Sequence, residues 1–139
     1  MIPRADIPVA IRATWPPKAV EHVGPFVLGD GAGGGNRVSA AQLRDPASDG
    51  GTVTPDDIAH VAERQSARGD EPLFMVFGWQ DALDRTLAAE GYTIRDETIL
   101  LAAPSAEVAQ TPPPVSCFEI WPPLAVQEEI WTQGGIGRE

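Results

Sequence analysis

The stretch LFMVFGWQDALDRTLAAEGY, residues 73–92, organises the rest of the chain. It opens with five apolar residues in a row, 73–77, which stand between Pro72 and Gly78. A strand with one face in water would alternate apolar and polar side chains, so this unbroken run predicts a strand that is buried on both faces.

A helix is predicted directly after this strand. Asp81 can cap its first turn, Leu83 and Leu87 lie one turn apart on one face, and Gly91 can adopt the left-handed conformation that ends a helix. A second strand is predicted over residues 92–102. The order strand, helix, strand is that of a crossover packed on an open sheet, and it predicts a mixed α/β (α+β) fold.

Two short helical segments are predicted at the N-terminus. Asp6 can cap a helix in which the apolar residues Ile7, Ile11 and Trp15 recur every four positions. The proline pair after Trp15 holds that residue extended and begins a second helical turn, which we expect to run to residue 22.

A hairpin and a well-marked helix follow. Residues 26–28 predict a strand, the glycine-rich segment 29–35 its turn, and residues 37–43 the returning strand. After an exposed loop at 44–51, the sequence Thr54-Pro55-Asp56-Asp57 combines a capping Thr, a first-turn Pro and carboxylates at the positive end of the helix dipole. It predicts a helix that runs to about residue 68.

The last part of the chain has a different composition. Residues 104–114, PSAEVAQTPPP, are small, polar and proline-rich, which is typical of a stiff linker. Residues 115–121, VSCFEIW, predict one more strand, and Pro122 opens a helix. We therefore expect a lobe at 1–103, a linker at 104–114, and at 115–139 a strand and helix that would open a second lobe, absent or truncated in this chain.

One short sequence occurs twice. WPPKAV at residues 15–20 returns as WPPLAV at residues 121–126, with five of six residues identical. In each copy the Trp can fold onto the Val of a following helix as a hydrophobic staple. Chance repetition in a chain with 14 prolines is one interpretation. The other is that two related lobes begin with the same device.

Composition narrows the classes of function. Twenty acidic and ten basic residues give a formal net charge of -10, a field that repels nucleic acids and anionic membrane surfaces. No apolar run approaches the ~18 residues of a membrane span. The single Cys117 cannot form an internal disulfide, and the N-terminus does not resemble a signal peptide. These features predict a cytoplasmic protein that binds neither nucleic acid nor membrane.

Several segments together resemble the GNAT acetyltransferase superfamily. Glu90-Gly91-Tyr92 and the following TIRDETILLAA resemble the end of that fold, where a helix closing in Gly-Phe or Gly-Tyr precedes a long antiparallel strand. The wider order, GPFVLGDGAGGGNRVSA, a helix from Thr54, PLFMVF and LAAEGY, resembles the N-terminal lobe of two-lobed GNAT-like proteins whose second lobe holds acetyl-CoA.

This resemblance implies a central mixed, mostly antiparallel sheet flanked by helices. It also implies acetyl-CoA as cofactor and N-acetyltransferase activity, the transfer of acetyl to an amine. Residues 1–103 would then be a degenerate GNAT-like lobe, non-catalytic by itself.

The part of the family pattern that holds acetyl-CoA is not found in this chain. GNAT enzymes bind the pyrophosphate on backbone amides of a Gln/Arg-x-x-Gly-x-Gly/Ala loop. The corresponding segment 50–55 reads GGTVTP, in which Pro55 has no amide hydrogen, and the adjoining Asp56 and Asp57 repel phosphate. The family's frequent general acid, a Tyr, is replaced by Leu87.

No catalytic or cofactor-binding residue can therefore be named, and whether the chain is itself an enzyme stays open. The alternative to an acetyltransferase lobe is a non-enzymatic interaction or dimerisation module on the same scaffold, since fold does not fix function.

Three other patterns favour structural roles. Residues 29–34 satisfy GxGxxG after a strand, but we expect a strand to follow, so a plain hairpin turn is favoured over a dinucleotide site. His22 and His60 are isolated, and no metal site is predicted. Cys117 lies in an apolar segment without a basic neighbour, which favours burial over reactivity.

A few residues are candidates for contact with a ligand or partner. Arg37 and Ser39, beside the glycine-rich tip, can bind an anion, and Trp121 can contact a substrate between lobes or belong to a core or interface. Without a second lobe, four apolar residues would lack a core, which predicts a homo-oligomer or pairing with another chain. They are Phe118, Trp121, Ile130 and Trp131.

Overall fold

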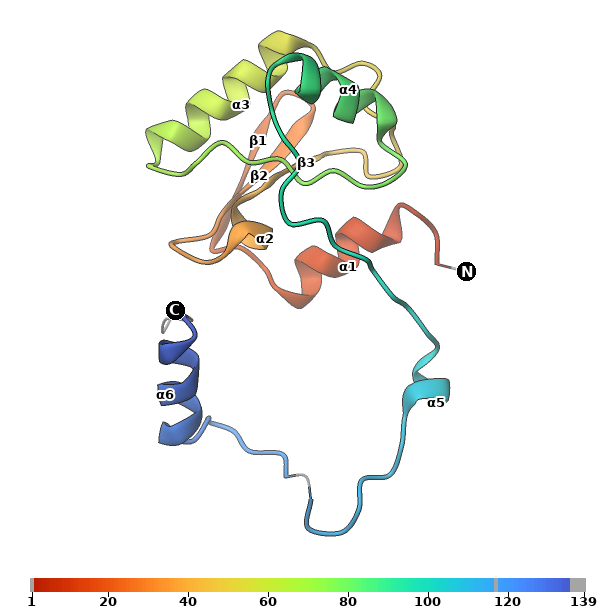
Figure 1. The fold of residues 1–139 in the computed structure, drawn as a ribbon, viewed down its shortest axis with the longest axis vertical. Coiled ribbons are helices and arrows are strands. Elements are labelled where there is room, and N and C mark those ends of the chain that lie inside the picture. The colour runs from red at the N-terminus through yellow and green to blue at the C-terminus, as the bar shows by residue number, and fades with distance from the viewer. Residues whose placement is uncertain (1, 117, 136–139) are drawn as a thin grey trace. The chain divides into compact units, whose positions relative to one another are not determined.

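A computed structural model describes residues 2–116 and 118–135 (Figure 1). The chain divides into two compact units, residues 1–97 and residues 98–139, and each is described by itself. The division into 1–103, 104–114 and 115–139 stays a prediction.

The first unit is built on a three-stranded antiparallel sheet, which confirms the mixed α/β class. The strands are β1 (Ala19–Val23), β2 (Phe26–Asp30) and β3 (Ala41–Leu43), in the spatial order β1-β2-β3. A tight turn at Gly24, whose φ of 52° is left-handed, joins β1 to β2. The pairing of β2 with β3 confirms the antiparallel partners predicted on either side of the glycine-rich segment.

Helices cover both faces of this sheet (Figure 1). Helices α3 (Pro55–Ala67) and α4 (Asp81–Ala89) lie over one face, and α1 (Asp6–Thr14) lies over the other. Successive strand residues point to opposite faces, and those facing α3 and α4 form the main core. Its buried members are Val23, Phe26, Leu28, Ala41, Leu43, Val53, Ile58, Val61, Leu83 and Leu87.

The two helices on the core side follow the sequence closely. In α3, the Thr54 hydroxyl accepts a hydrogen bond from the Asp57 amide, so the predicted capping Thr is confirmed; the Asp57 carboxylate in turn accepts from the Thr54 amide, which completes a capping box. Helix α4 also forms, and Gly91 has the predicted left-handed φ of 87°. Asp81 is its first helical residue, however, and Gln80 occupies the cap position.

The apolar run at 73–77 is extended, but it is not a strand buried on both faces. One parallel bridge joins Phe74 to Ala41. Around it, Ala41 N donates to Leu73 O and Met75 N donates to Ala41 O, at 2.9 and 2.8 Å. The pairing with β3 does not extend beyond this bridge, and residues 73–76 remain partly exposed.

The strand predicted over residues 92–102 is not formed. Tyr92 packs edge-on against Phe74, with ring centroids 5.2 Å apart, and the chain then leaves the core. Ile94, Ile99 and Leu101 are each at least 79% exposed. This segment pairs with no strand of the described sheet, and β-branched residues stabilise a strand only when cross-strand partners cover them.

Two local predictions near the N-terminus are wrong. Residues 19–23 form β1 rather than a helical turn, because each of them pairs with a residue of β2. The segment before β3 is the short helix α2 (Asn36–Ser39) rather than the first half of a strand. The returning strand is therefore reduced to residues 41–43.

The second unit contains two helices among its described residues, α5 (Ser105–Val108) and α6 (Ala125–Gln133). Helix α6 confirms the helix predicted after Pro122. Residues 115, 116 and 118–121 form no strand, and Cys117 lies outside the described residues. Trp121 is 87% exposed, so the predicted staple onto α6 is not formed.

Candidate functional site

The start of α3 is closed to an anion by the chain's own side chains. Thr54 N donates to Asp57 Oδ2 at 3.0 Å, and Asp57 N donates to Thr54 Oγ1 at 3.3 Å. The preceding amides are occupied as well, since Gly51 N donates to Asp49 Oδ1 at 2.8 Å. With Pro55 at the first helical position, a carboxylate stands where a phosphate would need free N–H groups.

The loop before α3 is also fixed against the neighbouring helix. Gly50 has a left-handed φ of 83°, and a Cβ at this position would lie 2.6 Å from the Leu83 Cβ. Leu87, the residue that the sequence comparison set against the family's Tyr, is buried in the core of this unit. The interior between α3 and α4 is therefore filled by packed apolar side chains.

The glycine-rich loop after β2 carries no long helix. Its turn is held by a hydrogen bond from Ala32 N to Asp30 Oδ1 at 2.9 Å. Helix α2 follows, but it spans only four residues. The loop therefore connects β2 to β3 through a helix of one turn, too short to form an anion site, and the strand on which the plain hairpin interpretation rested is not formed at residues 36–39.

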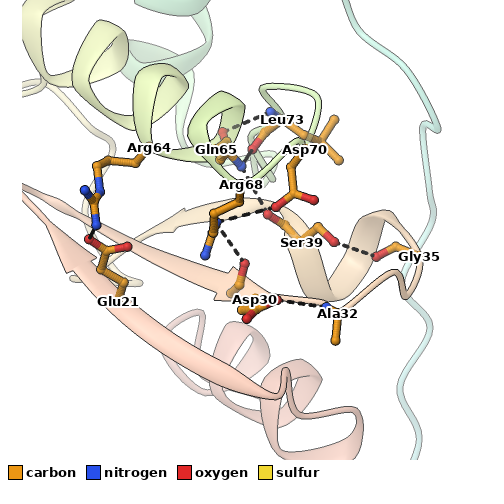
Figure 2. Close-up of polar contacts among 11 residues, drawn as sticks. Glu21, Asp30, Ala32, Gly35, Ser39, Arg64, Gln65, Arg68, Asp70 and Leu73 are labelled. Atoms are coloured by element: carbon orange, nitrogen blue, oxygen red, sulfur yellow. Dashed lines mark hydrogen bonds and ion pairs between the residues drawn. The ribbon is translucent and has the colours of Figure 1, made fainter.

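A polar cluster joins α3 to the sheet (Figure 2). Gln65 is fully buried, and its amide donates to the carbonyls of Ser39 and Leu73 at 3.1 and 3.0 Å while accepting from Leu73 N at 3.2 Å. Nearby, Arg64 pairs with Glu21 at 2.6 Å. Because the Gln65 side chain is fully hydrogen-bonded, this cluster has a structural role.

A different arrangement exists on the opposite face of the sheet, beneath α1. There the chain forms a small hollow with a volume of about 10 Å³, roughly the space of one water molecule. Its lining comes from α1, the sheet and α2: Ile11, Arg12, Trp15, Pro17, Val20, Val27, Gly29, Arg37, Val38, Ala40 and Gln42. We refer to these residues as the α1 hollow.

The shape of the α1 hollow depends on a glycine. The carbonyl of Val38 passes so close to Gly29 that a Cβ there would collide with it. Gly29 therefore lets α2 lie directly on β2, which brings Arg37 to the rim of the hollow.

Two polar groups of the hollow lack partners. Gln42 is only 3% exposed, and its Oε1 forms no hydrogen bond within the described residues. The same is true of Arg12 Nη1, which is buried although the rest of Arg12 is partly exposed. Buried polar groups of folded proteins are normally hydrogen-bonded, so this pair marks the hollow as unusual.

The hollow also has a positive rim. The Arg37 guanidinium lies over the Trp15 ring, 5.2 Å from its centroid, which is a cation–π arrangement. Neither Arg12 nor Arg37 takes part in an ion pair in the described part of the chain. No Asp or Glu lines the hollow, although acidic residues outnumber basic ones two to one overall.

The three residues predicted from the sequence as ligand contacts fall in different places. Arg37 lines the α1 hollow. Ser39 does not line the hollow. Its hydroxyl donates to Gly35 O at 3.5 Å, and its carbonyl accepts from Gln65. Trp121 belongs to the second unit and is largely exposed.

Sequence reasoning missed Arg12, Trp15 and Gln42 as site residues. A signal was present at Gln42, because a polar side chain between Ala41 and Leu43 in a short apolar strand must face away from the main core. The place of Arg12 depends on how α1 packs on the sheet, which no local pattern reveals.

The remaining titratable residues to consider are the two histidines and the tyrosine. His22 and His60 are both exposed. Burial, with a smaller contribution from Glu90, raises the pKa of the Tyr92 phenol above its ordinary value of 10.0. Residues 2–116 and 118–135 contain no group of three or more metal-ligating side chains and no helix long and apolar enough to span a membrane.

Comparison with known proteins gives no relative from which a function could be transferred. No family model, no curated protein and no solved structure matches this chain.

Proposed function

We propose that this chain is the non-catalytic N-terminal lobe of a GNAT-like N-acetyltransferase. The family proposal rests on the order of sequence segments around residues 24–40, 72–77 and 87–92. The observation that carries the non-catalytic role is the capping box at the start of α3, where Asp57 occupies the amide that a cofactor phosphate would need.

The physical reason is competition for the same donors. A pyrophosphate bound at a helix start takes hydrogen bonds from free amides and gains from the helix dipole. Here Asp57 already accepts from the Thr54 amide and hydroxyl, at 3.0 and 2.7 Å, and Asp56 adds a second negative charge. In this proposal acetyl-CoA is held by a complete second lobe, and the reaction is acetyl transfer from acetyl-CoA to an amine. We place it in the cytoplasm, because a single cysteine allows no internal disulfide.

Calorimetric titration of the 139-residue chain with acetyl-CoA tests this proposal. We expect no saturable heat up to millimolar acetyl-CoA and no acetyl transfer to amines. The double variant Asp56→Asn, Asp57→Asn serves as a matched comparison, since it removes the repelling charge but leaves Pro55 in place. Micromolar binding by the unmodified chain would overturn the non-catalytic assignment.

A second candidate function is a non-enzymatic interaction or dimerisation module. It is favoured by the apolar side chains that residues 98–135 leave in solvent. Phe118, Trp121 and Ile130 are each at least 61% exposed, and Trp131 is 42% exposed. Exposed apolar residues in such density are typical of surfaces that meet a partner.

Sedimentation velocity over a hundredfold range of protein concentration tests this candidate. Concentration-dependent dimers that are lost in the variant Phe118→Ser, Trp121→Ser would support it. A single monomeric species at every concentration would contradict self-association.

A further inference from the structure

We propose that the α1 hollow binds the carboxylate group of a small molecule with a short aliphatic chain. The proposed contacts are the guanidinium groups of Arg12 and Arg37 and the side-chain amide of Gln42. This proposal is independent of acetyl transfer, because the hollow and the start of α3 lie on opposite faces of the sheet.

The first argument is hydrogen bonding. Gln42 is 3% exposed, and both its Oε1 and Arg12 Nη1 are buried without partners among the described residues. A side-chain amide can turn about its last bond and present either its oxygen or its NH₂ group at the same place. An incoming acceptor can thus take hydrogen bonds from Arg12 and, after that rotation, from Gln42 as well.

The second argument is charge. Arg12 and Arg37 come from separate helices and both line the hollow, and neither is neutralised by an ion pair in the described residues. Guanidinium groups match the planar geometry of a carboxylate and can bind both of its oxygens. In a chain with a net charge of -10, two unpaired arginines at one hollow form a local site for an anion.

The third argument is size and surroundings. The volume of about 10 Å³ is that of roughly one water molecule, so the hollow itself takes one carboxylate oxygen while the rest of the ligand lies outside it, and a nucleotide or a sugar is excluded. The lining also includes the apolar side chains of Ile11, Val20 and Val27. These side chains suit a short hydrocarbon tail, so the structure favours an aliphatic monocarboxylate over a free inorganic anion.

Titration of the full ¹⁵N-labelled chain with sodium propionate, followed by NMR, tests the proposal. We expect saturable shifts of the Gln42 side-chain amide and of the Trp15 indole N–H. The variants Arg12→Gln and Arg37→Gln should each weaken propionate binding at least tenfold. Arg85→Gln removes the same charge from an exposed position on α4, outside the hollow, and should leave the affinity unchanged.

Two further ligands separate specific binding from general effects. Sodium phosphate at equal ionic strength reports on any anion, and propionamide reports on a neutral group of the same shape. Shifts that do not saturate, or an equal response to either of these ligands, would overturn the proposal. Equal weakening by Arg85→Gln would overturn it too.

The variant Gln42→Glu provides a readout besides ligand affinity. It places a carboxylate inside the hollow, at the position proposed for the ligand. We expect the melting temperature to stay the same or to rise and propionate binding to be lost. If the charge is instead poorly accommodated and the melting temperature falls, Arg12 and Arg37 do not form an anion site.

Discussion

The chain contains nearly the same six residues twice, and the two copies fold differently. In WPPKAV, residues 15–20, the final Ala and Val begin strand β1. In WPPLAV, residues 121–126, the corresponding Ala and Val begin helix α6. The sequences differ only at the fourth position, Lys18 against Leu124.

The difference lies in the partners that each copy meets. Lys18 N donates to Asp30 O at 2.9 Å, and Ala19 and Val20 pair with Asp30 and Gly29 of β2. Leu124 N instead donates to Gln127 Oε1 at 2.7 Å, three residues ahead in the same segment. A neighbouring strand thus overrides the local preference of a short sequence, and the local preference prevails where no strand is paired with it.

The same contrast separates the two units. Residues 1–97 contain a core in which Phe26, Leu28 and Val61 are completely buried. In residues 98–135, neither α5 nor α6 contains a buried residue. Apolar residues are present in both units, so the two units differ in whether other residues cover these side chains.

The largest expected effect comes from a matched pair of phenylalanine truncations. Phe26→Ala removes a fully buried ring that contacts Phe74 edge-on at 5.3 Å, and we expect a loss of about 3–5 kcal/mol in the free energy of unfolding. Phe118→Ala removes a ring that is 69% exposed, and the change should stay within about 0.5 kcal/mol. Urea denaturation followed by circular dichroism measures both. Equal losses would mean that Phe118 is covered in solution.

The next effect compares a buried glutamine in the first unit with a partly exposed one in the second. Gln65→Leu leaves the Leu73 amide and the Ser39 carbonyl without their partner, whereas Leu73 O keeps its hydrogen bond from Ala41 N, and we expect a loss of about 3 kcal/mol. Gln127→Leu removes one exposed hydrogen bond, to Leu124 N, and should cost less than about 1 kcal/mol. The same denaturation experiment compares them. A small loss for Gln65→Leu would show that water replaces its hydrogen bonds.

Local signals in the sequence were enough for helices α3 and α4, although not for α2. The run Thr54-Pro55-Asp56-Asp57 carries every part of a capping box, and Gly91 ends α4 as its position indicates. Strand pairing was harder to predict, because it depends on distant residues. The apolar run at 73–77 looked like a central strand, yet a single bridge, between Phe74 and Ala41, joins it to β3.

A smaller effect tests the best-predicted element, the start of α3. Thr54→Ala removes the hydroxyl that accepts from Asp57 N, and we expect a loss of about 1 kcal/mol. Thr54→Ser keeps an equivalent acceptor and should restore most of that stability. The difference between the two variants, measured by thermal unfolding, isolates the cap. Equal destabilisation by Ala and Ser would assign the effect to the Thr54 methyl group instead.

The candidate site was less accessible from the sequence than the fold. Arg37 stood out because it adjoins the glycine-rich loop, but the same reasoning selected Ser39, whose groups are engaged elsewhere. The α1 hollow arises where α1 crosses the far face of the sheet and brings Arg12 next to Gln42. Such a meeting of residues 30 positions apart depends on tertiary packing, for which a single sequence holds no local sign.

The smallest expected effect lies where the chain leaves the core, at Tyr92. Burial, together with Glu90, raises the pKa of this phenol above 10.0, so the folded chain holds the proton more tightly than the unfolded chain. The stabilisation is fully present below the unfolded pKa and is lost as the pH rises through the folded pKa. We expect the unfolding free energy of the native sequence to fall more steeply above about pH 10 than that of Tyr92→Phe. Tyr92 is the single tyrosine of the chain, so phenolate absorbance reports its titration alone. The prediction fails if the two proteins have identical pH profiles and the phenol titrates at its ordinary pKa. That result would mean that Tyr92 is detached from Phe74 and that the first unit ends before residue 92.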